Sequence, residues 1–253
     1  MSLTFSPGNH QYRMDRKRVS GVTTIIKKGL PTEGLMYWSA GAVAEWVADN
    51  EAEVTTLRGM GRGPMVAALK GVPWQQRDEA AVRGTDVHAI AEQVIHGAEV
   101  DVPEHLAGHV RGYVDFLDRF GVVPVLTEKS CGNRAVWYAG RFDLIADIAG
   151  TRWMLDNKTS RKVYGSTALQ CDAYAHAEFY VTDDDPDTEH PMPEGIERLG
   201  VLHVTEHGTS LYPLGTSGEP FAVFRHIAYV ASRRDAIDAY LSDPITEPEE
   251  LTA

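Results

Sequence analysis

The stretch that decides the fold is residues 136–158, which read VWYAGRFDLIADIAGTRWMLDNK. Apolar and polar side chains alternate over 136–148 and again over 151–158, and Ala149-Gly150 separates the two runs. Alternation with a period of two is typical of a β-strand, and a short connection that contains glycine favours a hairpin. If the two strands pair about this turn, Ile148 lies opposite Thr151. The sequence therefore predicts an antiparallel hairpin.

This register determines which polar side chains meet. Asp143 is expected opposite Asp156, and Arg141 opposite Lys158, with all four side chains on one face. Directly opposed residues have Cβ atoms roughly 5 Å apart, and like charges there destabilise the pair. Two opposed carboxylates favour a divalent cation between them, and oxygen ligands suit Mg²⁺ or Mn²⁺. The alternative is a solvent-facing strand with ordinary Asp–Lys pairs, and a one-residue bulge would spoil the register.

The rest of the chain predicts helices before the hairpin and a mixture of elements after it. Residues 9–26 are expected to be extended, 59–64 to be a glycine-rich connector, and 35–47, 74–95 and 103–120 to be helices. Strands are expected at 122–128, 199–205 and 209–214, and helices at 166–181 and 220–241. This order predicts an α/β or α+β fold with a mixed central sheet flanked by helices.

Composition limits the class of protein. The 253 residues are 43% hydrophobic with a mean hydropathy of −0.26, which is typical of a globular chain. No run approaches the roughly 18 apolar residues of a membrane span, and residues 1–10 lack the pattern of a secretory signal. Two distant cysteines, Cys131 and Cys171, argue for a reducing compartment and against an iron–sulfur cluster. We expect a soluble cytoplasmic protein without membrane contact.

Charge leaves nucleic-acid binding open. The net charge of −12 and the pI of about 5.2 argue against a general nucleic-acid coating protein, because phosphate binding relies on Lys and Arg. A nuclease whose positive charge is local and completed by bound cations remains compatible with these values. The acidic run 183–189 is expected to be a solvated loop.

Motifs between residues 83 and 174 resemble those of the RecB-like branch of the PD-(D/E)xK nuclease superfamily. They are Arg83-Gly84-Thr85-Asp86-Val87-His88 on a predicted helix, Gly140-Arg141-Phe142-Asp143 and Asp156-Asn157-Lys158 on the hairpin, and Gln170 with Tyr174 downstream. Four signals in the expected order are more specific than any one motif. CRISPR-associated members usually hold an iron–sulfur cluster with four cysteines, so the resemblance is to phage-type members that lack it.

The resemblance implies the roles of the central residues. Asp143 and Asp156 are the implied metal-binding carboxylates, with His88 and the Asn157 carbonyl as further ligands of one or two Mg²⁺ or Mn²⁺ ions. Lys158 is the implied residue that positions or deprotonates the attacking water, or stabilises charge on the phosphate, and we favour the electrostatic role. Glu128 matches the acidic first motif only loosely, as a water-mediated ligand or as a strand-end charge.

The outer residues have two readings each. Glu92 follows His88 by one helical turn, where it orients the histidine or is plain surface charge. The predicted helix places Gln170 and Tyr174 on one face, where they contact the substrate backbone or brace the catalytic strand. Phosphate contact or simple surface solvation is expected of the basic residues Arg141, Arg161 and Lys162.

The resemblance implies a restriction-endonuclease-like core at 76–245, a helical N-terminal cap at 1–75 and a tail at 246–253. The function it implies is a metal-dependent deoxyribonuclease, an exonuclease that acts on DNA in recombination, repair or replication, with a recombination or replication protein as partner. Two alternatives stay open: a structure-specific endonuclease on the same fold, and a catalytically silent DNA-binding or interaction module. The sequence does not indicate polarity, strand preference or oligomeric state.

Overall fold

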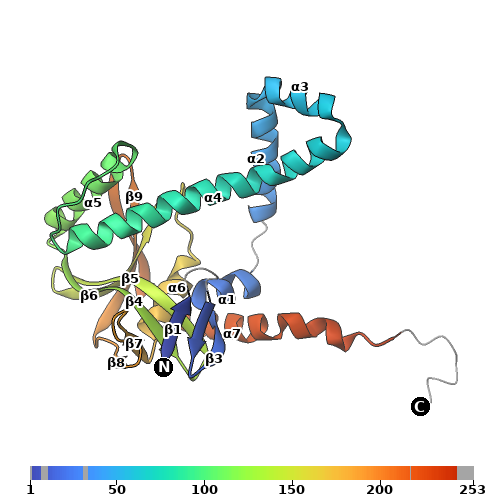
Figure 1. The fold of residues 1–253 in the computed structure, drawn as a ribbon. Helices are drawn as coiled ribbons and strands as arrows, with labels where there is room; N and C mark the ends of the chain where they lie inside the picture. Colours follow the sequence, from blue (N-terminus) through green and yellow to red (C-terminus); the bar gives the residue numbers. More distant parts are fainter. Residues whose placement is uncertain (1, 7–10, 31–33, 217, 244–253) are drawn as a thin grey trace, which may run out of the picture.

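The structure is a computed structural model that describes residues 2–6, 11–30, 34–216 and 218–243. Over these ranges the chain forms one mixed sheet with helices on both faces (Figure 1). The strands are β1 (Leu3–Ser6), β2 (Gln11–Met14), β3 (Lys17–Gly21), β4 (Val123–Asn133), β5 (Tyr138–Ile148), β6 (Thr151–Lys158), β7 (Phe179–Val181), β8 (His190–Pro191), β9 (Ile196–Thr205) and β10 (Gly208–Thr216). The helices are α1 (Val22–Gly29), α2 (Gly34–Asp49), α3 (Glu51–Met60), α4 (Arg62–Ile95), α5 (Ala107–Phe120), α6 (Thr167–Ala175) and α7 (Glu219–Arg233), with 3₁₀ helices η2 (Glu104–Leu106) and η3 (Arg234–Tyr240).

The predicted α/β class with a mixed sheet is confirmed. The main path of the sheet runs β1-β2-β3-β5-β4-β7-β8, while β6 pairs with β5 and β9, and β9 pairs with β10. The β3–β5 and β6–β9 pairs are parallel and the others antiparallel. Because parallel neighbours need crossover connections, helices are carried to both faces of such a sheet.

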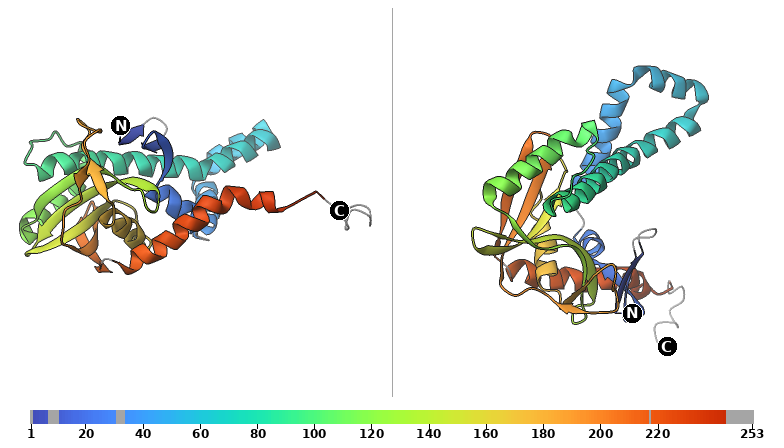
Figure 2. Two further views of the ribbon diagram at one scale, coloured as in Figure 1. Left: turned by 90° about the horizontal axis from the view of Figure 1, so that it is seen from below. Right: turned by 60° about the vertical axis from the view of Figure 1, so that its left-hand side comes forward.

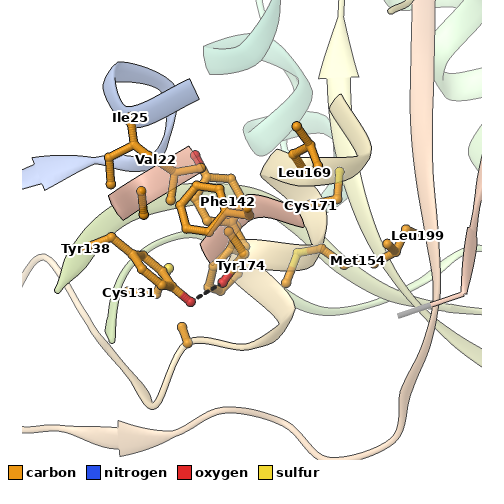
Figure 3. Close-up of a cluster of buried hydrophobic side chains, with 14 of the residues drawn as sticks. Val22, Ile25, Cys131, Tyr138, Phe142, Met154, Leu169, Cys171, Tyr174 and Leu199 are labelled. Carbon is orange, nitrogen blue, oxygen red and sulfur yellow. Dashed lines mark hydrogen bonds between the residues drawn. The ribbon is translucent and has the colours of Figure 1, made fainter. Parts of the chain in front are cut away.

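Each face of the sheet has its own apolar core. One core joins Val22 of α1, Leu169 of α6 and Phe224 of α7 to Phe142 and Met154 of the sheet (Figure 3). The other joins residues of α4 and α5 to the opposite sides of the same strands: Val87, Ile90, Ala91, Tyr113, Phe116, Leu144, Ala146 and Leu155. Strands β5 and β6 are therefore buried on both faces, which explains their near-continuous apolar character.

The hairpin prediction is confirmed in its register from Leu144 to the turn, whereas the predicted pairs Asp143–Asp156 and Arg141–Lys158 lie beyond the last paired residues, Leu144 and Leu155. Leu144 pairs with Leu155, Ala146 with Trp153, and Ile148 with Thr151. The turn residues Ala149 and Gly150 both have positive φ, +50° and +79°, as a two-residue hairpin loop requires. The predicted helix end at Gly121 is also confirmed, since this residue adopts φ +56° directly after α5.

Several predicted boundaries were wrong. Residues 22–29 form helix α1 instead of continuing the extended segment, and packing of Val22 and Ile25 into the core explains it. The expected connector at 59–64 is helical except at Gly61, because α3 ends at Met60 and α4 already begins at Arg62. Helix α6 ends at Ala175, because residues 179–181 pair with β4 as strand β7. Helix α7 gives way to η3 at Arg234.

The predicted division of the chain between residues 75 and 76 falls inside α4. Strands β1 to β3 add to the sheet, whereas α2, α3 and the first part of α4 project from it as an arm (Figures 1 and 2). The predicted tail 246–253 lies outside the described residues. Among the helices that are described, none has the length and apolar character needed to cross a membrane.

Candidate metal centre

The candidate site lies where strand β5 changes its partner on one side. The start of β5 pairs with β3 at Tyr138 and Ala139, and its end pairs with β6 from Leu144 onward. Between these pairings, Asp143 Oδ2 accepts a 2.7 Å hydrogen bond from the backbone N–H of Asn157. We call this point, where β5 stops pairing with β3 and before it pairs with β6, the fork. Here the side chain of Asp143 takes the place of a ladder hydrogen bond and satisfies the amide of Asn157.

Three potential metal ligands meet on the α4 side of this fork. His88 comes from α4, Glu128 from β4 and Asp143 from β5, and their ligand atoms all lie within 4.8 Å of one another. The Nδ1 atom of His88 is 3.6 Å from a carboxylate oxygen of Glu128 and 3.6 Å from Oδ2 of Asp143. Residues far apart in the sequence are therefore brought together as one imidazole and two carboxylates.

The ring of His88 is oriented by the backbone of β6. Its Nε2 atom lies 2.9 Å from the carbonyl oxygen of Asn157, and because a carbonyl only accepts, Nε2 carries the hydrogen. This contact turns Nδ1 toward the two carboxylates, as in metal sites where a second hydrogen bond orients the histidine. The Asn157 carbonyl, predicted to be a ligand, thus lies at the far nitrogen of the ring and serves to orient His88.

The cluster has an excess of negative charge. The negative charge of Asp143 raises the pKa of His88 to about 9, and the nearby Glu128 carboxylate acts in the same direction, although burial opposes both. Burial in turn raises the pKa of Asp143 to about 7, and the charges of Asp156 and Glu128 act in the same direction. A proton on His88 supplies the positive charge that a bound cation would otherwise provide.

Glu128 is held in an uncommon backbone conformation. Its φ is +48° in the middle of β4, which costs a non-glycine residue roughly 1–2 kcal/mol. Its carboxylate accepts a 2.9 Å hydrogen bond from Nε of Arg141, whose other nitrogens bind Asp183 at 2.9 and 3.1 Å. The backbone strain therefore places a carboxylate in the cluster, and the predicted phosphate contact Arg141 is engaged by two carboxylates.

Asp156 is not one of the three clustered ligands. It is buried, its Oδ1 accepts a 2.8 Å hydrogen bond from Gln170 of α6, and its Oδ2 lies 2.5 Å from Nζ of Lys158. Burial lowers the pKa of Lys158, but Asp156 and Asp143 outweigh it and the net shift is upward. Lys158 therefore remains a cation beside the fork, and Gln170 braces strand β6 through Asp156.

Burial corrects one predicted substrate contact. Tyr174 is only 4% exposed and packs in the core of Figure 3, so its side chain cannot reach a substrate. A methyl group at Gly140 would collide with the Tyr174 ring, which explains the glycine before Arg141. The Gly140-Arg141-Phe142-Asp143 motif thus includes a packing position as well as a ligand position.

The outer predicted residues have separate surroundings. Glu92 lines a small hollow of about 10 Å³ together with the three ligands, close to the smallest space that holds one water molecule. Arg161 and Lys162 are exposed on the loop after β6, and that loop is held by a 2.7 Å contact between Nε2 of His203 and the Ser160 carbonyl. They are free to meet a substrate, although nothing brings them into the cluster.

Two hydroxyl-bearing residues of the hollow were not predicted from the sequence. Tyr113 of α5 and Thr127 of β4 line it beside Asp143, and Thr127 bonds to Nε2 of His96 at 2.8 Å. Burial raises the pKa of Tyr113, so this ring stays neutral. The sequence offers no signal for them, because a tyrosine and a threonine on buried faces look like ordinary core residues.

Comparisons with known proteins add little. No family model matches the sequence, and no curated protein matches it. Among solved structures, the crystal structure of SSO0001 aligns with a TM-score of 0.36 and 12% identity, over 88% of this chain and 76% of that chain. A TM-score this low supports no inference about function, so the site has to be interpreted from its own chemistry.

Proposed function

We propose that the chain is a Mg²⁺- or Mn²⁺-dependent deoxyribonuclease of the PD-(D/E)xK type, similar to the RecB-like branch. The observation that carries the proposal is the convergence of His88, Glu128 and Asp143 within 4.8 Å, beside the Lys158–Asp156 pair. The three ligands come from three elements, α4, β4 and β5, and a purely structural cluster has no need for two partly buried carboxylates at one fork. The chain then acts on DNA in recombination, repair or replication.

The residues fit a hard divalent cation. Carboxylate oxygens suit Mg²⁺ and Mn²⁺, while the imidazole nitrogen shifts the preference toward Mn²⁺. The raised pKa of His88 supports the same view, because its largest cause is the negative charge of Asp143. Burial raises the pKa of Asp143, and the charges of Asp156 and Glu128 add to that shift. His88, Glu128 and Asp143 would hold the ion. Asp156 lies outside this set, where it pairs with Lys158.

The roles of the chain's own residues follow from their positions. A bound divalent cation supplies Lewis-acid polarisation of the phosphate and a water of lowered pKa. Asn157 orients His88 through its carbonyl and holds Asp143 through its amide. Lys158, kept protonated by Asp156, stabilises the negative charge that develops on the phosphate. Gln170 keeps Asp156 in place.

An exonuclease is our first choice within this class, since the family resemblance is to exonucleases. A structure-specific endonuclease is the alternative on the same fold, and a silent DNA-binding module is the alternative without chemistry. The strained backbone of Glu128 favours a catalytic protein over a silent DNA-binding module, because such strain persists where the function requires a particular side-chain position.

The test is cleavage of end-labelled linear DNA and closed circular DNA with Mg²⁺ or Mn²⁺. We expect metal-dependent loss of the linear substrate, circles spared, and a rate at least about 100-fold lower for Lys158→Ala, because removing one charge-stabilising group has that effect. Lys70→Ala is the matched control: Lys70 is exposed on α4 and its loss should leave the rate unchanged. Circular dichroism checks that each variant is folded.

The other outcomes distinguish the alternatives. Nicked circles would indicate an endonuclease. Binding of DNA without cleavage under either metal would indicate a silent module. Equal rates for Lys158→Ala and Lys70→Ala would show that any cleavage does not depend on this site.

A further inference from the structure

A second hollow, here called the α7 groove, opens on the face of the sheet opposite the metal centre. It has a volume of about 920 Å³, and its walls include Lys28 of α1, Trp137 of the β4–β5 connection, and Phe221, Arg225, His226 and Tyr229 of α7. Helices α1 and α7 pack against each other beneath it. This volume is at the upper end of the roughly 300–1,000 Å³ of ligand pockets, so the groove has room for a molecule and is too wide for a single ion.

The charge of the α7 groove is opposite to that of the chain. Over the whole sequence 36 acidic residues outnumber 24 Lys and Arg, yet the described residues that line the groove include Lys28, Arg225 and His226 and neither Asp nor Glu. Lys28 forms a 2.8 Å ion pair with Asp235, whereas Arg225 and His226 have no ion-pair partner within the described part of the chain. The groove is therefore complementary to an anion.

The α7 groove also presents two aromatic rings to solvent. Tyr229 is 65% exposed and Trp137 is 37% exposed. Trp137 has a φ of +65°, which is rare for a bulky residue, and its ring nitrogen donates a 3.4 Å hydrogen bond to the carbonyl of Arg18. The tryptophan is thus held in place at the groove by its backbone and by a hydrogen bond. Exposed rings between cationic side chains are typical of surfaces that bind single-stranded nucleic acid.

We propose that the α7 groove binds a single-stranded segment of nucleic acid. Bases stack on Trp137 and Tyr229, and Arg225 and His226 contact the phosphates between them. The inference deepens the proposed nuclease function and rests on it for its biological meaning. Asn133, which lines the groove, lies five residues along β4 from Glu128, about 17 Å at roughly 3.3 Å per residue, so the groove is a contact separate from the metal centre.

An acidic peptide is the competing occupant. It would use the cationic side chains, but its peptide groups and carboxylates have no aromatic face to stack on the two exposed rings. Nucleic acid uses both features at once, since every base has an aromatic face and every linkage a phosphate. We therefore commit to a single strand as the ligand and leave the peptide as an outcome of the test.

The experiment measures binding of a fluorescein-labelled twelve-nucleotide oligothymidylate by the full chain in a chelating buffer, which prevents cleavage. We expect Tyr229→Ala to weaken binding roughly tenfold, because stacking on one ring has this value. We expect Arg225→Ala to weaken binding and to reduce the slope of log affinity against log salt by about 0.7, the value for one phosphate contact on a single strand.

Two controls make the comparison specific. Arg111→Ala removes the same charge from an exposed position on α5, on the other face of the sheet. Val223→Ala shortens an exposed side chain of α7 that lies outside the groove. Both should bind the oligonucleotide as the wild type does. Because Arg225 and Tyr229 are also exposed, all four variants should keep the unfolding temperature of the wild type.

The outcomes separate the two proposals. Equal affinity of the groove variants and the controls would overturn the α7 groove, even if the wild type cleaves DNA with metal. Loss of binding in the groove variants, in a protein that cleaves nothing, would support the groove and overturn the nuclease. If poly-glutamate binds, depends on Arg225 and is unaffected by the oligonucleotide, the groove takes an acidic peptide and the nucleic-acid assignment is wrong.

Discussion

His88 links the two halves of the candidate site through its two ring nitrogens. Nδ1 faces Glu128 and Asp143, and Nε2 faces the backbone carbonyl of β6. A glutamine in its place keeps one polar contact but cannot carry the proton that balances the carboxylates. The proton on His88 therefore gives the metal-free protein a measurable pH dependence.

We predict that the metal-free protein loses stability as the pH rises from 6 to 9. The folded-state pKa of His88, about 9, is above its ordinary value of 6.5, so its contribution is complete below pH 6.5 and is lost as the pH passes 9. The pKa of Asp143, raised from its ordinary 3.8 to about 7, adds a loss in the same direction that is spread over roughly pH 4 to 7 and so affects only the lower end of this range. The measurement is the thermal unfolding temperature in chelator at several pH values.

The control is His88→Gln, which should show a shallower decline over the same pH range. Saturating Mn²⁺ should reverse most of the loss at pH 8 to 9, since a ligand that binds only the folded state stabilises it. A wild type and a His88→Gln protein with the same pH profile would contradict the proposed charge balance.

Helix α7 depends on one buried carboxylate from another helix. Asp172 of α6 is fully buried, and its Oδ2 accepts 2.8 Å hydrogen bonds from the backbone N–H groups of Gly218 and Phe221 at the start of α7. His176 pairs with its other oxygen at 3.1 Å, and the ring of His176 stacks on Phe221. An N-terminal helix cap is thus supplied from a distant element.

We predict that Asp172→Ala lowers the free energy of unfolding by roughly 3 kcal/mol. The substitution leaves two backbone amides without an acceptor and removes a buried charged partner, each worth about 1–3 kcal/mol. Urea unfolding monitored by circular dichroism measures the loss. Asp115→Ala, at an exposed position on α5, is the control and should stay within about 0.5 kcal/mol of the wild type. Equal midpoints for the two variants would falsify the capping role.

The molecule as a whole combines a two-faced sheet with a projecting arm. Among the described side chains of α2 and α3, only Ala42 and Val54 are buried, whereas Met36, Tyr37 and Met60 are more than 60% exposed. The sheet strands β5, β6 and β9, in contrast, are buried on both faces. Local stability follows buried apolar contact, so the two regions should differ in how often they open.

We predict that amide hydrogens of α2 and α3 exchange with solvent at least about 100-fold faster than those of β5, β6 and β9. The reason is that opening the arm exposes little buried surface, whereas opening the central strands exposes both cores. Hydrogen–deuterium exchange followed by mass spectrometry measures the order. Protection of the arm equal to that of the central strands would contradict this view, and would point to a partner or second copy covering the arm.

The sequence by itself determined the elements whose signals are local. Alternation and a two-residue turn were sufficient for the β5–β6 hairpin and its register, and helical spacing with a terminal glycine was sufficient for α5. It also placed His88, Asp143, Asp156 and Lys158 as candidates, through motif order. These features depend on neighbours within a few residues, where periodicity and turn chemistry decide the conformation.

Only the tertiary structure decided which of these candidates meet. In it, Asp156 contacts Lys158 and Gln170 of α6 and is not a member of the ligand cluster. Glu128 lies in the cluster because of its strained φ, and the Asn157 carbonyl faces His88. The tertiary structure also buried Tyr174 and assembled the α7 groove from α1, α7 and the β4–β5 connection. These outcomes depend on contacts between residues far apart in the chain. Packing geometry determines such contacts, and local sequence patterns carry no information about it.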